Sequence, residues 1–285
     1  MSGLKSIRWF GILIFLVGMC WGCAGPAGPA YSPKFPTGIE TIDGAQKDLA
    51  RLLGKGDFRI YYYDTDYHIT NAAMENDLKK RYPDIEVILY DNENLLWYIE
   101  VKKITVTPNG IDFPLYPLRF EDLVSADFIV QDNYELKLPN KLYLRFETDT
   151  DNLNKVADDL FFIKQNWDKD QAAQLSAFAA QAGQYRALKV KPPVSEEQRK
   201  FIVQANAISE QKEYARAISL YQKAIAVDPV SYPGAYFNMA LLSAQEHRFR
   251  SAIGYMKRYL LLVPDAKDAR SAQDKIYEWE AMSGK

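Results

Sequence analysis

Few residue types in this chain could perform chemistry, and their spacing matches no familiar catalytic or metal-binding pattern. His68 and His247 are the only histidines, and neither stands at the His/Glu or Cys/His spacing that builds a metal site. The runs 64–66 and 149–152 alternate acids as calcium loops do, but they lack the later glycine and glutamate. The sequence contains no nucleophile elbow, phosphate loop or glycine-rich dinucleotide turn. We therefore expect a protein that is not an enzyme and that has no cofactor, metal site or catalytic residue.

The two cysteines, Cys20 and Cys23, lie beside an N-terminal apolar run. Lys5 and Arg8 precede this run, which covers residues 9–19 and is shorter than the roughly 20 residues that span a bilayer. A short basic segment followed by an apolar core is typical of a signal peptide, which we place at residues 1–22. Because no cysteine follows, no disulfide can stabilise the mature fold.

This segment resembles the signal of a bacterial lipoprotein, in which a cysteine after a small residue receives acyl chains such as palmitate. The resemblance makes Cys23, which follows Gly22, the expected lipid anchor, and more than one acyl chain gives stable membrane attachment. Cys20 departs from the pattern, because such signals usually carry Leu or Val there. Ala24, where enteric inner-membrane lipoproteins tend to have Asp, implies the outer membrane of the cell envelope, facing the periplasm. A conventional secretory signal with incidental cysteines is the alternative.

Positive and negative charges almost balance, with 35 Lys and Arg against 37 Asp and Glu, and no long basic run is present. A nucleic-acid partner is not expected, because binding to phosphates requires concentrated positive charge. Shifts in composition divide the rest of the chain into a flexible tether (23–40), an α+β middle domain (41–167), a helix and linker (168–194) and an all-α repeat domain (195–285).

In the middle domain the pattern predicts one helix followed mainly by strands. Apolar residues at helical spacing between Ile42 and Leu53 share one face, and Gly54 ends that helix. Residues 108–110, Pro-Asn-Gly, are a strong turn signal. A second amphipathic helix is expected at 151–167, with a further helix at 71–82 and strands at 58–63, 86–90, 95–106, 111–113, 115–120, 126–130, 134–138 and 141–147.

Strands closed by one amphipathic helix resemble a pleckstrin-homology-like domain over roughly residues 95–167. The resemblance implies a strongly bent sheet with a helix plugging one end. Lys102-Lys103 could suggest phosphoinositide binding, but no basic cluster accompanies them. Residues 57–90 do not fit this resemblance and could form an extra lobe.

The C-terminal part contains two segments that align at one offset. An aromatic residue, an alanine and a proline of the first segment recur in the second after 35 positions (249 − 214 = 35), as the pairs Tyr214 and Phe249, Ala217 and Ala252, and Pro229 and Pro264. The segments resemble tetratricopeptide repeats, whose period is about 34 residues. The resemblance implies two helical hairpins, with a helix at 265–282 that covers their exposed end. Because stable arrays usually need more repeats, the cap, the middle domain or a partner must supply further support.

The same resemblance implies a groove lined by the first helix of each pair, where a peptide or a partner helix binds. Ile202 stands where repeats that clamp a terminal carboxylate have Lys, so an extended peptide or a helix is favoured. The implied groove residues are Arg199, Asn206, Glu210, Phe237, Asn238, Leu241 and Gln245. Ordinary surface or packing roles are the alternative for each of them.

We therefore expect a lipid-anchored scaffold that recruits a protein or peptide partner in the cell envelope. One alternative places a small-ligand or enzymatic site in the middle domain, at Asp64, Asp66 and His68, with the repeats recruiting it to a complex. Another makes the chain a subunit of a secretion or cell-wall assembly with no separable activity.

Overall fold

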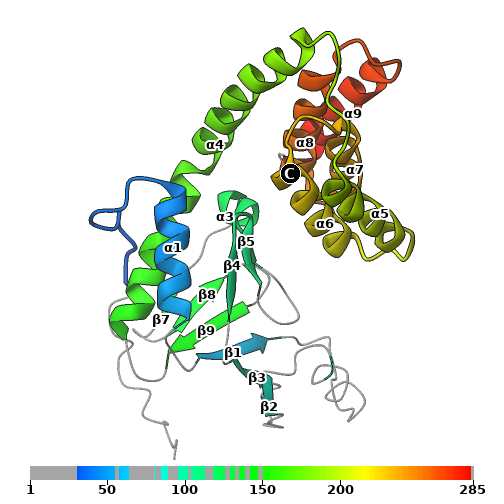
Figure 1. The fold of residues 1–285 in the computed structure, drawn as a ribbon. Helices are drawn as coiled ribbons and strands as arrows, with labels where there is room; N and C mark the ends of the chain where they lie inside the picture. Colours follow the sequence, from blue (N-terminus) through cyan, green and yellow to red (C-terminus); the bar gives the residue numbers. More distant parts are fainter. Residues whose placement is uncertain are drawn as a thin grey trace, which may run out of the picture.

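The chain is α+β, with helices in the majority of the residues that can be placed (Figure 1). The computed structural model describes residues 31–54, 58–63, 80, 85–88, 96–101, 104–112, 118–125, 129–131, 135–138, 142–146 and 150–283. The predicted signal peptide with Cys23, nearly all of the predicted helix at 71–82, and the candidate residues Asp64, Asp66 and His68 lie outside the described residues.

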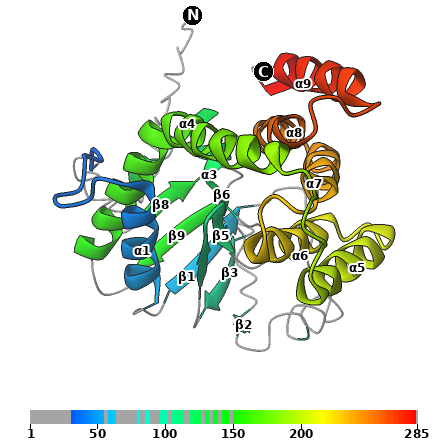
Figure 2. The same cartoon turned by 45° about the horizontal axis from the view of Figure 1, so that its top comes forward.

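Helix α1 (Ile42–Leu53) confirms the first predicted helix in both its bounds and its buried face. The five predicted apolar residues are its buried ones: Ile42, Ala45, Leu49, Leu52 and Leu53. The Thr41 hydroxyl accepts a hydrogen bond from the Gly44 amide at 3.1 Å, which caps the N-terminus. The buried face packs against helix α4 (Thr150–Ala187), and the two helices lie side by side in Figures 1 and 2.

A six-stranded antiparallel sheet lies beside these helices. Strand β1 is central, because Phe58 is opposite Val101 of one neighbour and Phe146 of the other. Residues 57–90, for which an extra lobe was one possibility, instead contribute strand β1 to the middle of the sheet. The order is β2 (Ile85–Ile88), β3 (Leu96–Val101), β1 (Phe58–Tyr63), β9 (Leu142–Phe146), β8 (Glu135–Leu138) and β7 (Ile129–Gln131).

A smaller sheet contains β4 (Thr105–Thr107), β5 (Gly110–Asp112) and β6 (Leu118–Arg119). The predicted turn is confirmed, since Thr107 pairs with Gly110 across it. Gly110 is needed for close approach, because a Cβ there would lie 2.1 Å from the Leu118 carbonyl oxygen. The single strand predicted at 95–106 is wrong, since its two ends belong to different sheets.

Among the residues whose burial the structure describes, the core of this half comes mainly from helices, which does not support the prediction of a strand-rich, pleckstrin-homology-like middle domain. Helix α3 (Phe120–Ser125) begins at the last residue of the strand predicted at 115–120, so that prediction is wrong at Phe120. Its buried Phe120 packs edge-on against Trp167 of α4, with ring centroids 5.9 Å apart. Three of these core residues, Ile104, Ile111 and Leu118, come from outside the helices.

Helix α4 (Thr150–Ala187) is one continuous helix of 38 residues. Its first half buries an apolar stripe from Leu153 to Trp167 in the core just described. Its second half buries Phe178, Ala182 and Tyr185, at helical spacing, in the core of the C-terminal helices. The predicted boundary between residues 167 and 168 is therefore wrong, because the helix runs through it and belongs to both cores.

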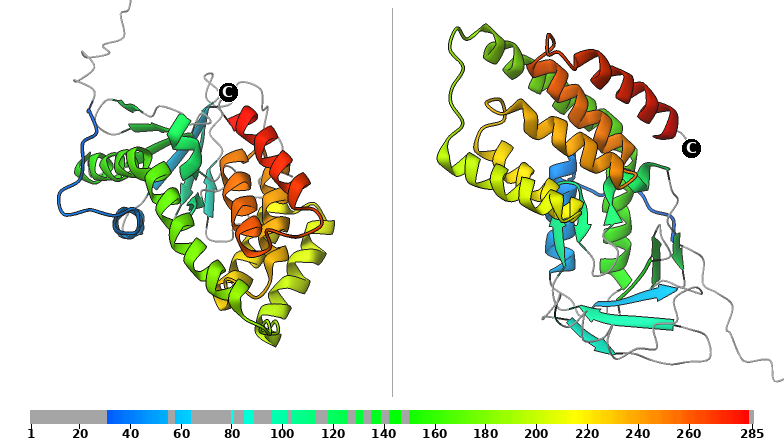
Figure 3. Two further views of the ribbon diagram at one scale, coloured as in Figure 1. Left: turned by 90° about the horizontal axis from the view of Figure 1, so that it is seen from above. Right: turned by 90° about the vertical axis from the view of Figure 1, so that its right-hand side faces the viewer.

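The C-terminal half is a row of five helices, each packed against the next (Figure 3). Turns of three residues join the first pair and the second pair, so the partners in each pair run antiparallel. The helices are α5 (Glu196–Glu210), α6 (Tyr214–Val227), α7 (Pro233–Gln245), α8 (Phe249–Leu262) and α9 (Ala269–Ser283). They include the predicted covering helix, whose buried residues are Ala272, Ile276 and Trp279.

The end of the predicted tether is held against α4. The Tyr31 hydroxyl donates to the Asp158 carboxylate at 2.9 Å, and the Lys34 amide donates to it at 2.8 Å. The Phe35 ring lies 5.4 Å from that of Phe161. Burial, together with the Asp158 hydrogen bond and charge, raises the pKa of Tyr31 to about 12. The prediction of a flexible tether up to residue 40 is therefore wrong for residues 31–35.

Candidate binding surfaces of the helical half

The two helical hairpins share a backbone turn as well as a sequence offset. Lys212 and His247, which are 35 positions apart (247 − 212 = 35), both adopt the left-handed conformation, with φ of 62° and 57°. In each turn the amide of the following residue donates a hydrogen bond to a carbonyl of the preceding helix, as in a Schellman motif. The Glu213 amide donates to the Ile208 carbonyl at 3.4 Å, and the Arg248 amide donates to the Ser243 carbonyl at 2.8 Å. His247 is thus a turn residue, and the equivalence of the hairpins extends to their geometry.

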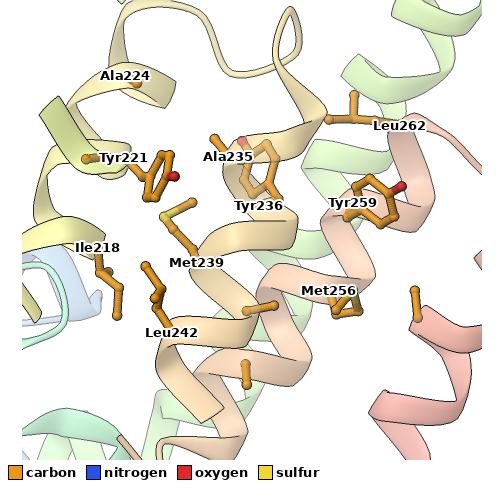
Figure 4. Close-up of a cluster of buried hydrophobic side chains, with 14 of the residues drawn as sticks. Ile218, Tyr221, Ala224, Ala235, Tyr236, Met239, Leu242, Met256, Tyr259 and Leu262 are labelled. Atoms are coloured by element: carbon orange, nitrogen blue, oxygen red, sulfur yellow. The ribbon is translucent and has the colours of Figure 1, made fainter. Parts of the chain in front are cut away.

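Small residues let the helices of each pair approach closely. The fully buried alanines at these crossings are Ala205, Ala217, Ala240 and Ala252. Between the pairs, Figure 4 shows Tyr221 of α6 beside Met239 and Tyr236 of α7. The predicted small residues at the crossings are confirmed as buried, and aromatic and sulfur-containing side chains fill the remaining space.

Two of the predicted groove residues are joined through a buried tyrosine. Asn238 Nδ2 donates a hydrogen bond to the Tyr221 hydroxyl oxygen at 2.7 Å, and the Tyr221 hydroxyl donates to Asn206 Oδ1. Burial raises the pKa of Tyr221, while the Asn238 hydrogen bond acts in the opposite direction. The structure therefore brings the exposed Asn206 and the half-buried Asn238 together across α5, α6 and α7, through the Tyr221 hydroxyl.

The other predicted groove residues are spread over α5 and α7. Arg199 is exposed and forms an ion pair of 3.3 Å with Glu196 of its own helix. Glu210 and Gln245 are exposed, at the C-terminal ends of their helices. Phe237 and Leu241 are half-buried, and Phe237 lies with its ring centroid 5.1 Å from that of Tyr259 in α8. We refer to the predicted groove residues on these two helices as the α5/α7 face.

A cleft of about 840 Å³, which we name the α4 cleft, lies between α4, α6 and α8. The turn at 108–109 and the end of α9 also border it. Its lining includes Trp167 and Leu175 of α4, Lys223 of α6, and Tyr255 and Arg258 of α8. None of the seven predicted groove residues lines it. Sequence reasoning missed this site because it used the first helix of each pair, whereas α6 and α8 are the second helices.

The two halves of the molecule are joined beside this cleft by one buried and one exposed polar contact. Glu121 of α3 accepts from Arg248 Nε at 3.0 Å and from the Ser251 amide at 2.8 Å. Burial alone would lower the pKa of Arg248. The charge of Glu121 and its hydrogen bond outweigh this effect, so the pKa of Arg248 is raised. Asp168 of α4 forms an ion pair of 3.2 Å with Arg250. The cleft therefore has walls that are held in a defined arrangement.

Within the described part of the chain, no group of three or more His, Cys, Asp or Glu side chains is placed to hold a metal ion. In the same residues, no helix combines the length and the apolar character that crossing a membrane requires. Comparisons of the chain with protein-family models, curated proteins and solved structures find no match.

Proposed function

We propose that the chain is a scaffold protein of the bacterial cell envelope with two tetratricopeptide-type repeats that hold a protein or peptide partner. The observation that carries the proposal is the equivalence of the hairpins α5–α6 and α7–α8. Buried alanines and left-handed turn residues recur in them at one offset of 35 positions, as Lys212 and His247 illustrate. Stacked hairpins of this kind serve mainly to present binding surfaces for other proteins.

The short array has a support that stands in for further repeats. Phe178, Ala182 and Tyr185 of α4 complete the core of the hairpins, and the rings of Phe178 and Tyr236 lie 5.2 Å apart. Lys191 donates to the carbonyls of Tyr185, Arg186 and Leu188 at 2.7, 3.0 and 2.9 Å, which caps α4 where the chain turns toward α5. A preorganised surface loses little entropy when a partner binds.

The partner is proposed to bind the α5/α7 face and, separately, the exposed side of α9. Val203 of α5 is 57% exposed, Tyr277 of α9 is 60% exposed, and Phe237 and Leu241 of α7 are half-buried. Exposed large apolar and aromatic side chains are those that a partner covers with the greatest gain in free energy. Gln245 and the amide of Asn238 at the edge of this surface would pair with polar groups of a peptide or a helix.

Attachment to the outer membrane through acylated Cys23 is part of the same proposal. Seven residues separate Cys23 from Tyr31, the first residue held against α4 (31 − 23 − 1 = 7). Such a segment reaches at most about 25 Å when fully extended. The fold would therefore stand close to the membrane surface. Radiolabelled palmitate and membrane fractionation test this directly, since Cys23→Ser should abolish labelling and release the protein.

Partner capture tests the binding face. We expect a tagged full-length chain, cross-linked in envelope preparations, to retain a specific protein. The variant Val203→Glu with Tyr277→Glu should lose it, because two charges enter the apolar surface. Val190→Glu, at an 84% exposed position in the linker, is the matched control and should retain it. Equal recovery from all three proteins, with unchanged thermal unfolding, would contradict the assignment of this face.

A further inference from the structure

The α4 cleft concentrates positive charge in a protein whose net charge is slightly negative. Its charged lining residues are Lys223, Arg250, Lys257 and Arg258 against Asp168 and Glu280, a balance of +2 (4 − 2 = 2). The whole chain has a net charge of −2. Because the cleft is partly enclosed, this charge is screened less than the same charge on an open surface.

Two of the four cations are neutralised within the cleft. Arg250 is paired with Asp168, and Lys257 lies 3.2 Å from Glu280. Lys223 and Arg258 have no carboxylate within ion-pair distance in the part of the chain that the structure describes. Arg258 Nη1 donates instead to the Gly254 carbonyl at 3.2 Å. The excess charge therefore comes from one cation on α6 and one on α8.

A tyrosine between these cations is positioned to donate a hydrogen bond. Gln222 Nε2 donates to the Tyr255 hydroxyl oxygen at 3.0 Å, which holds this side chain across the gap between α6 and α8. In that bond the Tyr255 hydroxyl oxygen is the acceptor. The hydroxyl hydrogen of Tyr255 can therefore be donated to a ligand in the cleft. Lys223 follows Gln222 on α6, and Arg258 lies one turn after Tyr255 on α8. Lys223, Tyr255 and Arg258 thus line the same cleft, from α6 and α8.

The opposite wall belongs to α4 and carries apolar side chains beside the polar Asp168, Gln171 and Gln174. Trp167 and Leu175 line it, and Tyr236 of α7 contributes a further ring. The volume of about 840 Å³ is far more than a small inorganic anion needs, and lies in the upper part of the range for organic ligands. A fitting ligand carries negative charge on one side and apolar side chains on the other.

We propose that the α4 cleft binds a short acidic peptide segment of a partner protein, with its carboxylates at Lys223, Arg258 and the Tyr255 hydroxyl and an apolar side chain against Trp167 and Leu175. This site shares no residue with the α5/α7 face, so it does not rest on the function proposed for that face. It adds a second docking point, selective for charge, at the junction of the two halves.

Fluorescence anisotropy with the full-length protein tests the proposal. The probe is a short labelled peptide of alternating glutamate and phenylalanine, and its control alternates glutamine and phenylalanine. We expect the glutamate peptide to bind at least about tenfold more tightly, and to weaken as sodium chloride is raised. Lys223→Gln with Arg258→Gln should lower its affinity by about tenfold or more. Lys200→Gln with Lys267→Gln removes the same charge from exposed positions outside the cleft and should have little effect.

Several outcomes would overturn the proposal. Equal affinity of the two peptides would show that the carboxylates do not contribute to binding. An equal loss of affinity in the control variant would show that only the net charge of the protein matters. Inorganic phosphate that displaces the peptide at similar concentration would identify a compact anion site instead. Loss in Val203→Glu with Tyr277→Glu, but not in the cleft variant, would place the peptide on the α5/α7 face. The single variant Lys223→Glu, at an exposed position, repeats the test if the Arg258 change affects folding.

Discussion

Removal of the Glu121 carboxylate is expected to loosen the contact between the two halves of the molecule. Glu121 is 6% exposed and accepts from both Arg248 Nε and the Ser251 amide. The Ser251 amide belongs to the first turn of α8, whose N-cap residue Arg248 makes no side-chain capping bond. A carboxylate at a helix N-terminus satisfies a free amide and interacts well with the helix dipole. Helix α3 thus supplies the cap for a helix of the other half.

The size of the effect follows from what remains after each substitution. Glu121→Gln keeps an acceptor for the Ser251 amide but leaves the Arg248 guanidinium, only 10% exposed, with Glu246 at 3.4 Å. Removing one partner of a buried ion pair costs about 3–5 kcal/mol, and the remaining Glu246 should reduce this to about 2–3 kcal/mol. Glu121→Ala also removes the cap, which adds about 1 kcal/mol.

Urea unfolding followed by tryptophan fluorescence measures these free energies. A double-mutant cycle with Arg248→Gln should give a coupling energy of at least about 1 kcal/mol, because the second change relieves the unpaired charge. Asp112→Asn is the control, since it breaks the more exposed Arg119–Asp112 pair and should cost less than about 1 kcal/mol. A Glu121→Ala cost no larger than that of the control, or an additive cycle, would refute this account of the interface.

Four further changes follow from single buried or strained positions. Asp159, with both carboxylate oxygens buried and unpartnered, has its pKa raised to about 8 by burial foremost and by neighbouring carboxylates. In the unfolded chain the pKa of Asp159 is near 3.8, so the stability of the wild-type protein falls as pH rises from about 4 to 8. Asp159→Asn should therefore stabilise the protein by up to about 4 kcal/mol at pH 7 and by little near pH 4. Urea unfolding at several pH values measures this difference. Gly110→Ala should destabilise by more than about 2 kcal/mol in thermal unfolding, because its Cβ would collide with the Leu118 carbonyl. Tyr221→Phe should cost about 1–2 kcal/mol by the same measurement, since it deletes the hydroxyl that joins two asparagines. His247→Gly should raise the melting temperature slightly, by relieving about 1 kcal/mol of left-handed strain; a lower melting temperature would contradict this.

Local patterns were sufficient to predict elements whose apolar face is continuous. Helix α1 carries five apolar residues at helical spacing between a capping Thr41 and Gly54, and the structure agrees with each of them. The turn before Gly110 was predictable because Pro-Asn-Gly favours a tight reversal. The alanine crossings of the C-terminal helices were visible because they recur at a fixed offset.

Elements that depend on distant contacts were not predictable in the same way. Helix α3 has only Phe120 and Leu123 as buried apolar residues, too few to establish a helical period, and its burial depends on Trp167. In α4 the apolar stripe stops at Trp167 and resumes at Phe178. In the sequence alone, this interruption looks like a domain boundary. The α4 cleft lies along that polar interval. Because the predicted boundary between residues 167 and 168 divided α4, the sequence did not indicate the cleft.

The polar interval of α4 has a physical reason to remain helical. Residues 168–177 are rich in Ala, Gln, Asp and Lys and contain neither Gly nor Pro, so local propensity favours continuation. Both ends are fixed by separate cores, since Trp167 belongs to one and Phe178 to the other. A break in the interval would release the Asp168–Arg250 contact and open the cleft wall. Helix α4 therefore links the two halves. A ligand that bridges Trp167 and Arg258 would favour the orientation seen here, and a partner on the α5/α7 face would meet a surface whose position relative to the N-terminal half is set by α4.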